Sequence, residues 1–185
     1  MAEKLSENFT LEELIYSDTA KARGIDNSPT ALHKKILKHT CEYLLEPLRK
    51  YLNDKYKEYN GKKVKKVILK ITSGYRSATL NTAVGGVPTS QHSKGEAADL
   101  EAIVIYTNNV RADLPYNVLY EDIKAAVRAK IISVDQCIQE RTFDKVKKVW
   151  IYWIHISHHN AGKMRDRREF WKYDNGMYML DTRIN

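Results

Sequence analysis

Residues 90–99, with the sequence SQHSKGEAAD, place His92 seven residues before Asp99 at the junction of a long loop and a strand. Gly95 lies between them and permits a sharp backbone turn, so the strand can bring Asp99 back toward the imidazole of His92. A zinc site takes histidine nitrogens and carboxylate oxygens, and a catalytic one keeps a position open for water beside its protein ligands. This stretch therefore predicts two metal ligands and the junction around which the fold is organised.

The third ligand is expected from residues 150–157, whose sequence WIYWIHIS predicts a strand. His155 stands between Ile154 and Ile156, so its side chain points to the opposite face of the strand from both isoleucines. An imidazole on a face otherwise flanked by aromatic residues needs a polar partner, and a zinc ion would be a sufficient one. A hydrogen-bonded core histidine is the alternative that this strand, taken alone, leaves open.

The N-terminal part of the chain predicts helices. Thr10 can cap a short helical element with a capping box, and Gly24 ends this element. A second helix, capped by Ser28, extends to about residue 51 on an apolar period near 3.6 residues. Pro47 lies inside this helix and is expected to kink it.

The rest of the chain predicts a sheet with one inserted helix. The strands are expected at residues 65–72, 97–105, 133–140 and 149–157. The inserted helix is expected at residues 113–129, and residues 73–96 form a long loop of the kind that is usually functional. Helices followed by such a sheet predict an α+β fold, in which the N-terminal helices pack on a small antiparallel sheet.

Residues 1–185 are expected to form one domain, with a basic tail at residues 160–185 that wraps its edge. The chain has 31 Lys and Arg against 23 Asp and Glu, a formal net charge of +8. This charge suits either a polyanionic environment, such as nucleic acid or an anionic cell wall, or simply a solubilising surface. The lysines are not interleaved with aromatic residues as base stacking requires, so nucleic-acid binding is not expected.

The small number of cysteines and the lack of long apolar segments exclude further classes of protein. Cys41 and Cys137 are too few for a disulfide framework and have no metal-type spacing, which leaves two free thiols or one bridge. The N-terminus lacks the apolar core of a signal peptide, and no stretch approaches the roughly 18 to 20 apolar residues of a membrane span. The chain is therefore expected to be cytoplasmic when made, monomeric and not inserted in a membrane.

Several segments, taken in order, carry a family resemblance. They are residues 71–77 (ITSGYRS), 81–86 (NTAVGG), 90–99 and 153–157 (WIHIS). Together they resemble the zinc D-alanyl-D-alanine carboxypeptidase and L-alanyl-D-glutamate endopeptidase family, which includes phage endolysins and has a core similar to the Hedgehog signalling domain. The pattern SxHxxGxAxD within residues 90–99 is highly specific, and the resemblance spans about residues 9–158.

The resemblance implies roles for individual residues. His92, Asp99 and His155 match the zinc ligands of the family. Arg76 matches an arginine that contacts substrate and stabilises an oxyanion, which suits a fixed guanidinium near the metal. A hydrogen-bond donor that braces the loop is the alternative for Arg76. Substrate-binding residues are expected at Ser90, which would also orient a ligand, and at Gln91, Gln136 and His159; the alternative for His159 is polar surface at a strand end.

The sequence departs from the family at the general base. Many members carry an acidic residue three positions before the last histidine, where this chain has Tyr152. A tyrosine, with an unperturbed pKa of about 10, cannot take a proton from water near neutral pH. Glu140 is the expected substitute if its strand pairs antiparallel with the strand of His155, and Asp144 is the reserve candidate. A solvated charge at a strand end is the alternative for Glu140.

The expected function is a zinc metallopeptidase that hydrolyses peptidoglycan stem peptides, as a D-Ala-D-Ala carboxypeptidase or an L-Ala-D-Glu endopeptidase. The missing signal peptide favours a phage or prophage lysin, released to the cell wall by a holin-type partner that permeabilises the membrane. The alternative is a catalytically impaired, zinc-containing module that binds the cell wall or serves a phage structure.

Overall fold

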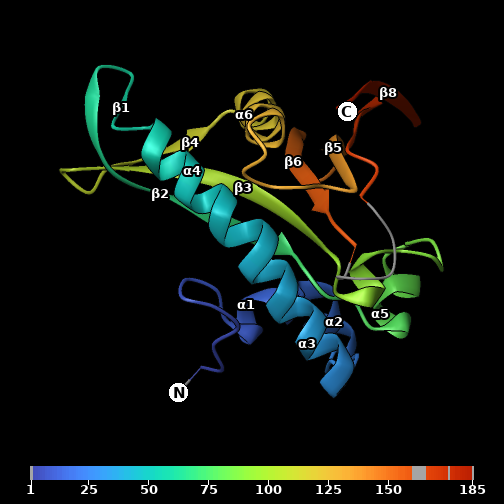
Figure 1. Ribbon diagram of the computed structural model, residues 1–185. Helices are drawn as coiled ribbons and strands as arrows, with labels where there is room; N and C mark the ends of the chain where they lie inside the picture. Colours follow the sequence, from blue (N-terminus) through green and yellow to red (C-terminus); the bar gives the residue numbers. More distant parts are fainter. Residues whose placement is uncertain (1, 160–165, 175, 185) are drawn as a thin grey trace.

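The computed structural model in Figure 1 describes residues 2–159, 166–174 and 176–184. Helices and a mixed, mostly antiparallel sheet make it an α+β fold, as the sequence predicts. The strands are β1 (Glu58–Tyr59), β2 (Lys62–Ser73), β3 (Ala97–Tyr106), β4 (Arg111–Leu114), β5 (Gln136–Asp144), β6 (Val149–Ser157), β7 (Glu169–Asp174) and β8 (Met177–Arg183). The helices are α1 (Leu11–Ile15), α2 (Asp18–Arg23), α3 (Ala31–Thr40), α4 (Glu46–Lys55), α5 (Ala78–Ala83) and α6 (Tyr116–Arg128), with the short turns η1 (Cys41–Leu45) and η2 (His92–Lys94).

The strand order of the sheet is β1-β2-β3-β6-β5-β7-β8, and β4 pairs with β3 beside this path. The pairing of β5 with β7 is parallel, and the other pairings among the described strands are antiparallel. Strand β6 thus lies between β3 and β5, although β5 precedes it in the chain. This order places residues of the middle and the end of the chain side by side at the centre of the sheet.

The two faces of the sheet differ. Leu100, Cys137, Ile154 and Ile156 are fully buried on the face covered by helices, where α4 contacts β2 and α6 contacts β5 and β6. Figure 1 shows α4 crossing in front of β2 and β3, with α6 beside β6. Because side chains alternate along a strand, His155 lies on the opposite face from its isoleucine neighbours, as the sequence predicts.

The N-terminal helices begin largely as the sequence predicts. The side chain of Thr10 accepts from the backbone of Glu13, whose carboxylate accepts in return, so the capping box is present. The predicted single element is two helices, α1 and α2, and Gly24 ends α2 with φ +60°. The predicted cap at Ser28 is wrong, because Thr30 caps α3 with its hydroxyl.

The helix interruption expected at Pro47 takes the form of a π-helical turn just before it. In η1 the backbone N–H of Glu46 donates to the carbonyl of Cys41, five residues earlier. Proline lacks an N–H and its ring clashes with the preceding turn of a regular helix. The wider turn therefore lets α3 lead into α4 without a break in the chain direction seen in Figure 1.

Several predicted boundaries are wrong. The expected loop at residues 73–96 contains the short helix α5, capped by Ser77, and the turn η2. The expected tail does not simply wrap the edge, because its described part forms β7 and β8, which extend the sheet beyond β5. Strand β5 continues past Glu140 to Asp144, so this glutamate lies within a strand.

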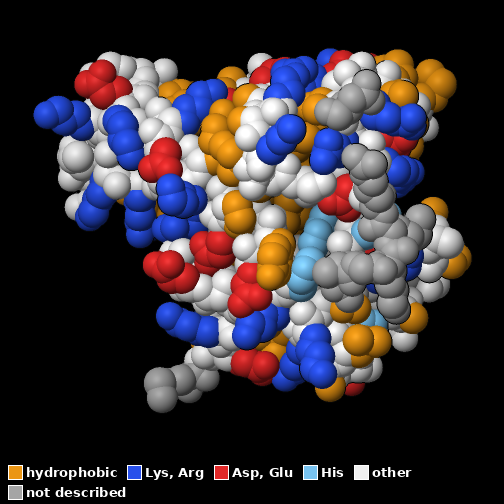
Figure 2. Space-filling view, in the orientation of Figure 1, with side chains coloured by type: hydrophobic (Ala, Val, Ile, Leu, Met, Phe, Trp, Pro, Cys, Tyr) orange, Lys and Arg blue, Asp and Glu red, His pale blue; other side chains and the backbone are white. Residues whose placement is uncertain are grey.

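Cysteines and surface charge complete the description. Cys41 and Cys137 are both free and buried, so the bridge left open by the sequence is not formed. Among the described residues, no helix combines the length and apolar character needed to cross a membrane. Lys and Arg side chains gather at the end of the molecule that holds β1 and β2, at the upper left of Figure 2.

Candidate metal centre

The backbone brings the three predicted ligands together from one turn and two strands. Asp99 of β3 and His155 of β6 lie directly opposite each other in the antiparallel register, so their side chains share a face. His92 begins η2, and Gly95 ends this turn with φ +77°, the left-handed conformation that glycine adopts without strain. The turn predicted at Gly95 is confirmed, and it directs His92 toward the strand pair.

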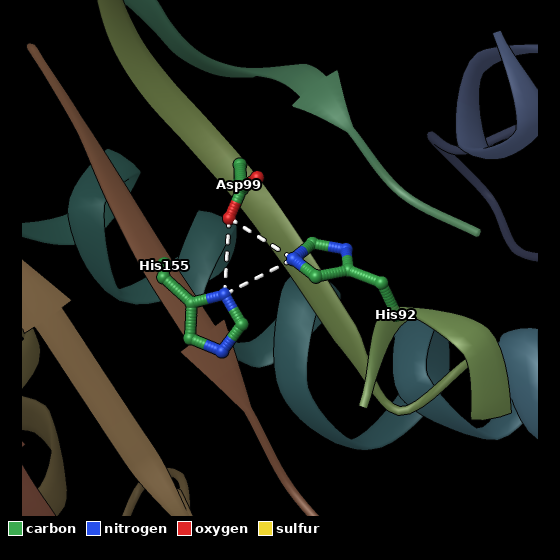
Figure 3. A group of neighbouring side chains, drawn as sticks. All are labelled: His92, Asp99 and His155. Carbon is green, nitrogen blue, oxygen red and sulfur yellow. Dashed lines mark hydrogen bonds and ion pairs between the residues drawn. The ribbon is translucent and has the colours of Figure 1, made fainter. Parts of the chain in front are cut away.

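The three side chains point at one another in a nearly equilateral arrangement (Figure 3). His92 Nε2 lies 3.1 Å from His155 Nδ1, and Asp99 Oδ1 lies 3.2 Å from the former and 3.0 Å from the latter. Ligand atoms about 2 Å from a tetrahedral zinc ion are separated by roughly 3.3 Å. The triangle therefore has close to the dimensions of one face of a zinc coordination tetrahedron.

Hydrogen bonding leaves acceptor atoms facing the centre of this triangle. His92 Nδ1 lies 2.7 Å from the carbonyl oxygen of Gly74, so it carries the proton and Nε2 of the neutral ring presents a lone pair. Asp99 Oδ1 is also an acceptor, and buried acceptors that face each other need a cation or a proton between them. The donor set thus fits a zinc ion, held by His92 Nε2, Asp99 Oδ1 and His155 Nδ1.

The second oxygen of Asp99 is held by Arg76. Arg76 Nη2 donates to Asp99 Oδ2 at 2.7 Å, and Arg76 Nε donates to the hydroxyl of Ser73 at 2.9 Å. Burial alone would raise the pKa of Asp99, but its interactions with His92 and His155 outweigh burial and hold this pKa well below its usual range. Arg76 therefore braces a candidate ligand through Asp99, and its hydrogen bond to Ser73 corresponds to the loop-bracing alternative, while its role toward a substrate stays a prediction.

The triangle opens into a cavity of about 1080 Å³. The residues predicted from the sequence to act there all line it: Arg76, Ser90, Gln91, Gln136, Glu140 and His159. Ser90 was expected to orient a ligand, but the described partner that orients His92 is the carbonyl of Gly74. The side-chain amide of Gln91 donates a hydrogen bond to the carboxylate of Asp135 at 3.2 Å.

Glu140 lies on the same face of the sheet as His155. It is directly opposite Trp153 in the β5–β6 register, and both side chains line the cavity. Burial raises its pKa to about 7, against the lowering effect of the His155 and Arg76 charges, while Asp99 adds to the rise. Tyr152 points the other way and stacks on Tyr116 with ring centroids 4.3 Å apart.

A buried carboxylate that the sequence did not mark lies beside the cavity. Asp135 is fully buried and accepts two hydrogen bonds from the guanidinium of Arg167, at 2.8 and 2.7 Å. Its Oδ1 also lies 3.2 Å from Nε2 of His159. The only signal for Asp135 was its place in the run that leads to Glu140, whereas Arg167 lies in the segment expected to be a tail.

His158 and Asp144 do not join the site. His158 is buried and stacks on His39 with ring centroids 4.8 Å apart, and burial lowers its pKa to about 4. Asp144 accepts backbone hydrogen bonds from Val146 and Lys147 in the hairpin turn. Neither residue lines the cavity around the metal triangle.

A buried His–Asp–His triangle with one side open to a cavity is typical of a zinc-dependent hydrolase. The family model of Peptidase M15 matches residues 7–135, and the chain belongs to this family. Membership confirms the resemblance to the zinc carboxypeptidase and endopeptidase family, and at that level it indicates a zinc peptidase acting on peptidoglycan. The matched residues include His92 and Asp99 but end before Glu140 and His155. A comparison with curated proteins finds no significant match.

Proposed function

We propose that the chain is a zinc-dependent peptidase that hydrolyses an amide bond in the stem peptide of peptidoglycan. The observation that carries this proposal is the metal triangle of His92, Asp99 and His155 beside the half-buried Glu140 in one open cavity. Family membership supports the reaction type and the substrate class. The proposal covers D-Ala-D-Ala carboxypeptidase and L-Ala-D-Glu endopeptidase activity.

The chain's own residues have separable tasks in this reaction. Zinc bound by the triangle would polarise the scissile carbonyl and make water a better nucleophile near neutral pH. Glu140 takes the proton of the attacking water and returns it to the leaving amine, because its carboxyl group lines the cavity on the face of the metal triangle. Arg76 is close enough to Asp99 to place positive charge beside the developing oxyanion.

The rival proposal is a module that has lost its chemistry, because Tyr152 replaces the acid usual in many members. The position of Tyr152 weakens this rival. Its ring stacks on Tyr116 away from the metal face, whereas Glu140 lines the cavity. A carboxyl group is thus supplied from the neighbouring strand, and an active enzyme is the better-supported proposal.

The biological setting is proposed from the sequence expectations. A lysin of phage or prophage origin would be monomeric, would reach the cell wall through a holin-type release partner and would cut the wall there. The basic surface at the β1–β2 end would suit an anionic wall. Nucleic acid is not a proposed partner.

The test is hydrolysis of purified peptidoglycan by the metal-free and the zinc-loaded protein, with released peptides identified by mass spectrometry. Activity is expected only with zinc, and His92→Ala should abolish it. His39→Ala is the matched control, because this histidine lies on α3 outside the cavity and should leave activity near the wild-type level. Full activity of a rigorously metal-free sample would overturn the proposal. The peptide masses would also identify the bond.

A further inference from the structure

The face of the sheet that carries the metal triangle continues beyond it across β5, β7 and β8. Ile138 of β5 is aligned with His155 on one side and with Trp171 of β7 on the other. Trp171 in turn pairs with Leu180 of β8. Since aligned residues share a face, these strands extend the open side of the sheet from the metal ligands to its edge.

This extension is rich in aromatic side chains, which we name the C-terminal aromatic face. It consists of Trp153, Trp171, Tyr173 and Tyr178. Leu180 and Ile151 flank it with exposed fractions of 48% and 38%, and Tyr178 is 55% exposed. Hydrophobic side chains are visible at the upper right of Figure 2, where Figure 1 places β8. Trp153, Trp171 and Tyr173 are half-buried, so each leaves part of its ring accessible. Accessible apolar area of this kind commonly marks a binding surface.

The rings of this face are held in place before any ligand arrives. Trp171 Nε1 donates to Glu169 at 3.3 Å, and Glu169 is itself bound by Arg167 and Arg183. Tyr173 and Tyr178 contact each other with ring centroids 4.7 Å apart. Tryptophan and tyrosine that are already fixed lose little conformational entropy on binding, so this surface is preorganised for a flat partner.

The aromatic face and the metal triangle belong to one continuous cleft. Trp153, Trp171 and Tyr178 line the same cavity as His155 and Glu140. Burial, and to a smaller extent the charge of Glu140, raise the pKa of Tyr178 to about 12. This effect agrees with a position of Tyr178 near Glu140 in the cavity. Two strand spacings of about 4.8 Å separate β6 from β7. About three extended residues span such a distance, so one molecule can contact both places.

The chemistry of the C-terminal aromatic face indicates which part of the substrate it would bind. A stem peptide offers mainly small and charged side chains, which would leave a large aromatic area uncovered. The sugar rings to which stem peptides are attached present flat faces of C–H groups, and these complement the negative faces of aromatic rings. Resting on the proposed function, we propose that the C-terminal aromatic face binds the saccharide of peptidoglycan, so that glycan-linked stem peptides are preferred over free ones.

The test compares kcat/KM for a disaccharide-linked stem peptide with kcat/KM for the same peptide without sugar. The wild-type ratio is expected to be well above one, and Trp171→Ala should lower it about tenfold. Trp171→Phe keeps a flat ring and should retain most of the ratio, which guards against misreading a folding defect. Trp150→Ala is the matched control, since Trp150 pairs with Phe143 on the opposite face and is itself exposed, and it should keep the wild-type ratio.

A binding measurement separates this proposal from the proposed function. Calorimetric titration of the zinc-loaded full chain with the disaccharide alone should show binding that Trp171→Ala weakens and Trp150→Ala preserves. If peptides are cleaved but the wild-type ratio is near one, or if Trp171→Ala leaves it unchanged, the saccharide proposal is overturned and the peptidase proposal stands. If no peptide is cleaved while sugar binding depends on Trp171, the peptidase proposal fails and the saccharide proposal stands.

Discussion

The Nδ1 atom of His92 lies 2.7 Å from the carbonyl oxygen of Gly74. This contact fixes the tautomer of the imidazole and aims its other nitrogen at Asp99 and His155. The carbonyl is itself fixed, because the next N–H, of Tyr75, donates to the carbonyl of Leu14 at 2.6 Å. Helix α1 is thus connected to the candidate metal site through a single loop residue.

Gly74→Ala should weaken metal binding. An added Cβ would lie 2.2 Å from the carbonyl oxygen of Leu14, so the backbone must shift and carry the His92 partner with it. We expect zinc affinity, measured by competition with a chelating dye, to fall about 10- to 100-fold. Gly61→Ala is the control: its φ of +70° imposes strain, but the turn is remote from the site. Equal affinity in both variants would contradict the assigned role of Gly74.

Glu140→Gln should lower kcat/KM by about 100-fold or more, because glutamine cannot accept a proton from water. The measurement is release of peptides from purified peptidoglycan by the zinc-loaded protein. Asp144→Asn provides the comparison, since Asp144 lies in the hairpin turn and should be dispensable for catalysis. A near-normal rate in Glu140→Gln would move the general base to another residue.

The same substitution should change how the stability of the metal-free protein depends on pH. Burial raises the pKa of Glu140 from 4.5 to about 7, so the folded state favours the protonated carboxyl. The stabilisation of the wild type from this group is complete below pH 4.5 and is lost as the pH rises through about 7. Glutamine keeps a neutral side chain at every pH.

Glu140→Gln should therefore become more stable than the wild type across this range. The difference in the free energy of unfolding should grow to at most roughly 3 kcal/mol and then level off. Urea denaturation of both metal-free proteins from pH 4 to pH 8 would measure it. A difference that does not vary with pH would argue against a buried Glu140.

The two thiols should be unreactive in the folded protein. Burial raises the pKa of Cys41 and of Cys137, so little thiolate is present near neutral pH and neither sulfur is accessible. A thiol-specific reagent should label both cysteines in denaturant and neither under native conditions, with no effect of prior reduction. Rapid labelling of the native protein would contradict this packing.

The candidate metal triangle could be predicted from two local determinants together with the family resemblance, which assigned His155 as a ligand. Gly95 sets the turn between His92 and Asp99, and strand alternation sets the direction of His155. The choice of Glu140 as candidate general base depended on a longer inference, that β5 and β6 pair antiparallel. The register shows that Glu140 shares the face of the candidate ligands. Local patterns thus placed the candidate site better than they placed the limits of its elements.

The missed elements are those whose formation depends on partners elsewhere in the chain. Helix α5 has six residues, too few for an apolar period to appear. Strand β7 pairs with β5, and β8 pairs with β7, but the segment was expected to be a tail that does not join the predicted sheet. Consequently Trp171 and Arg167 could not be assigned to the cavity from sequence alone.

The position of β6 between β3 and β5 also affects when the metal site can form during synthesis of the chain. His155 lies 56 residues after Asp99, so a chain emerging from the ribosome displays two ligands well before the third. Such an intermediate lacks the complete ligand set, and the ion can be captured only once the late strand has entered the sheet. On the proposed function, a truncated copy would be inactive, and hydrolysis would begin only in molecules whose synthesis has run past the central strand.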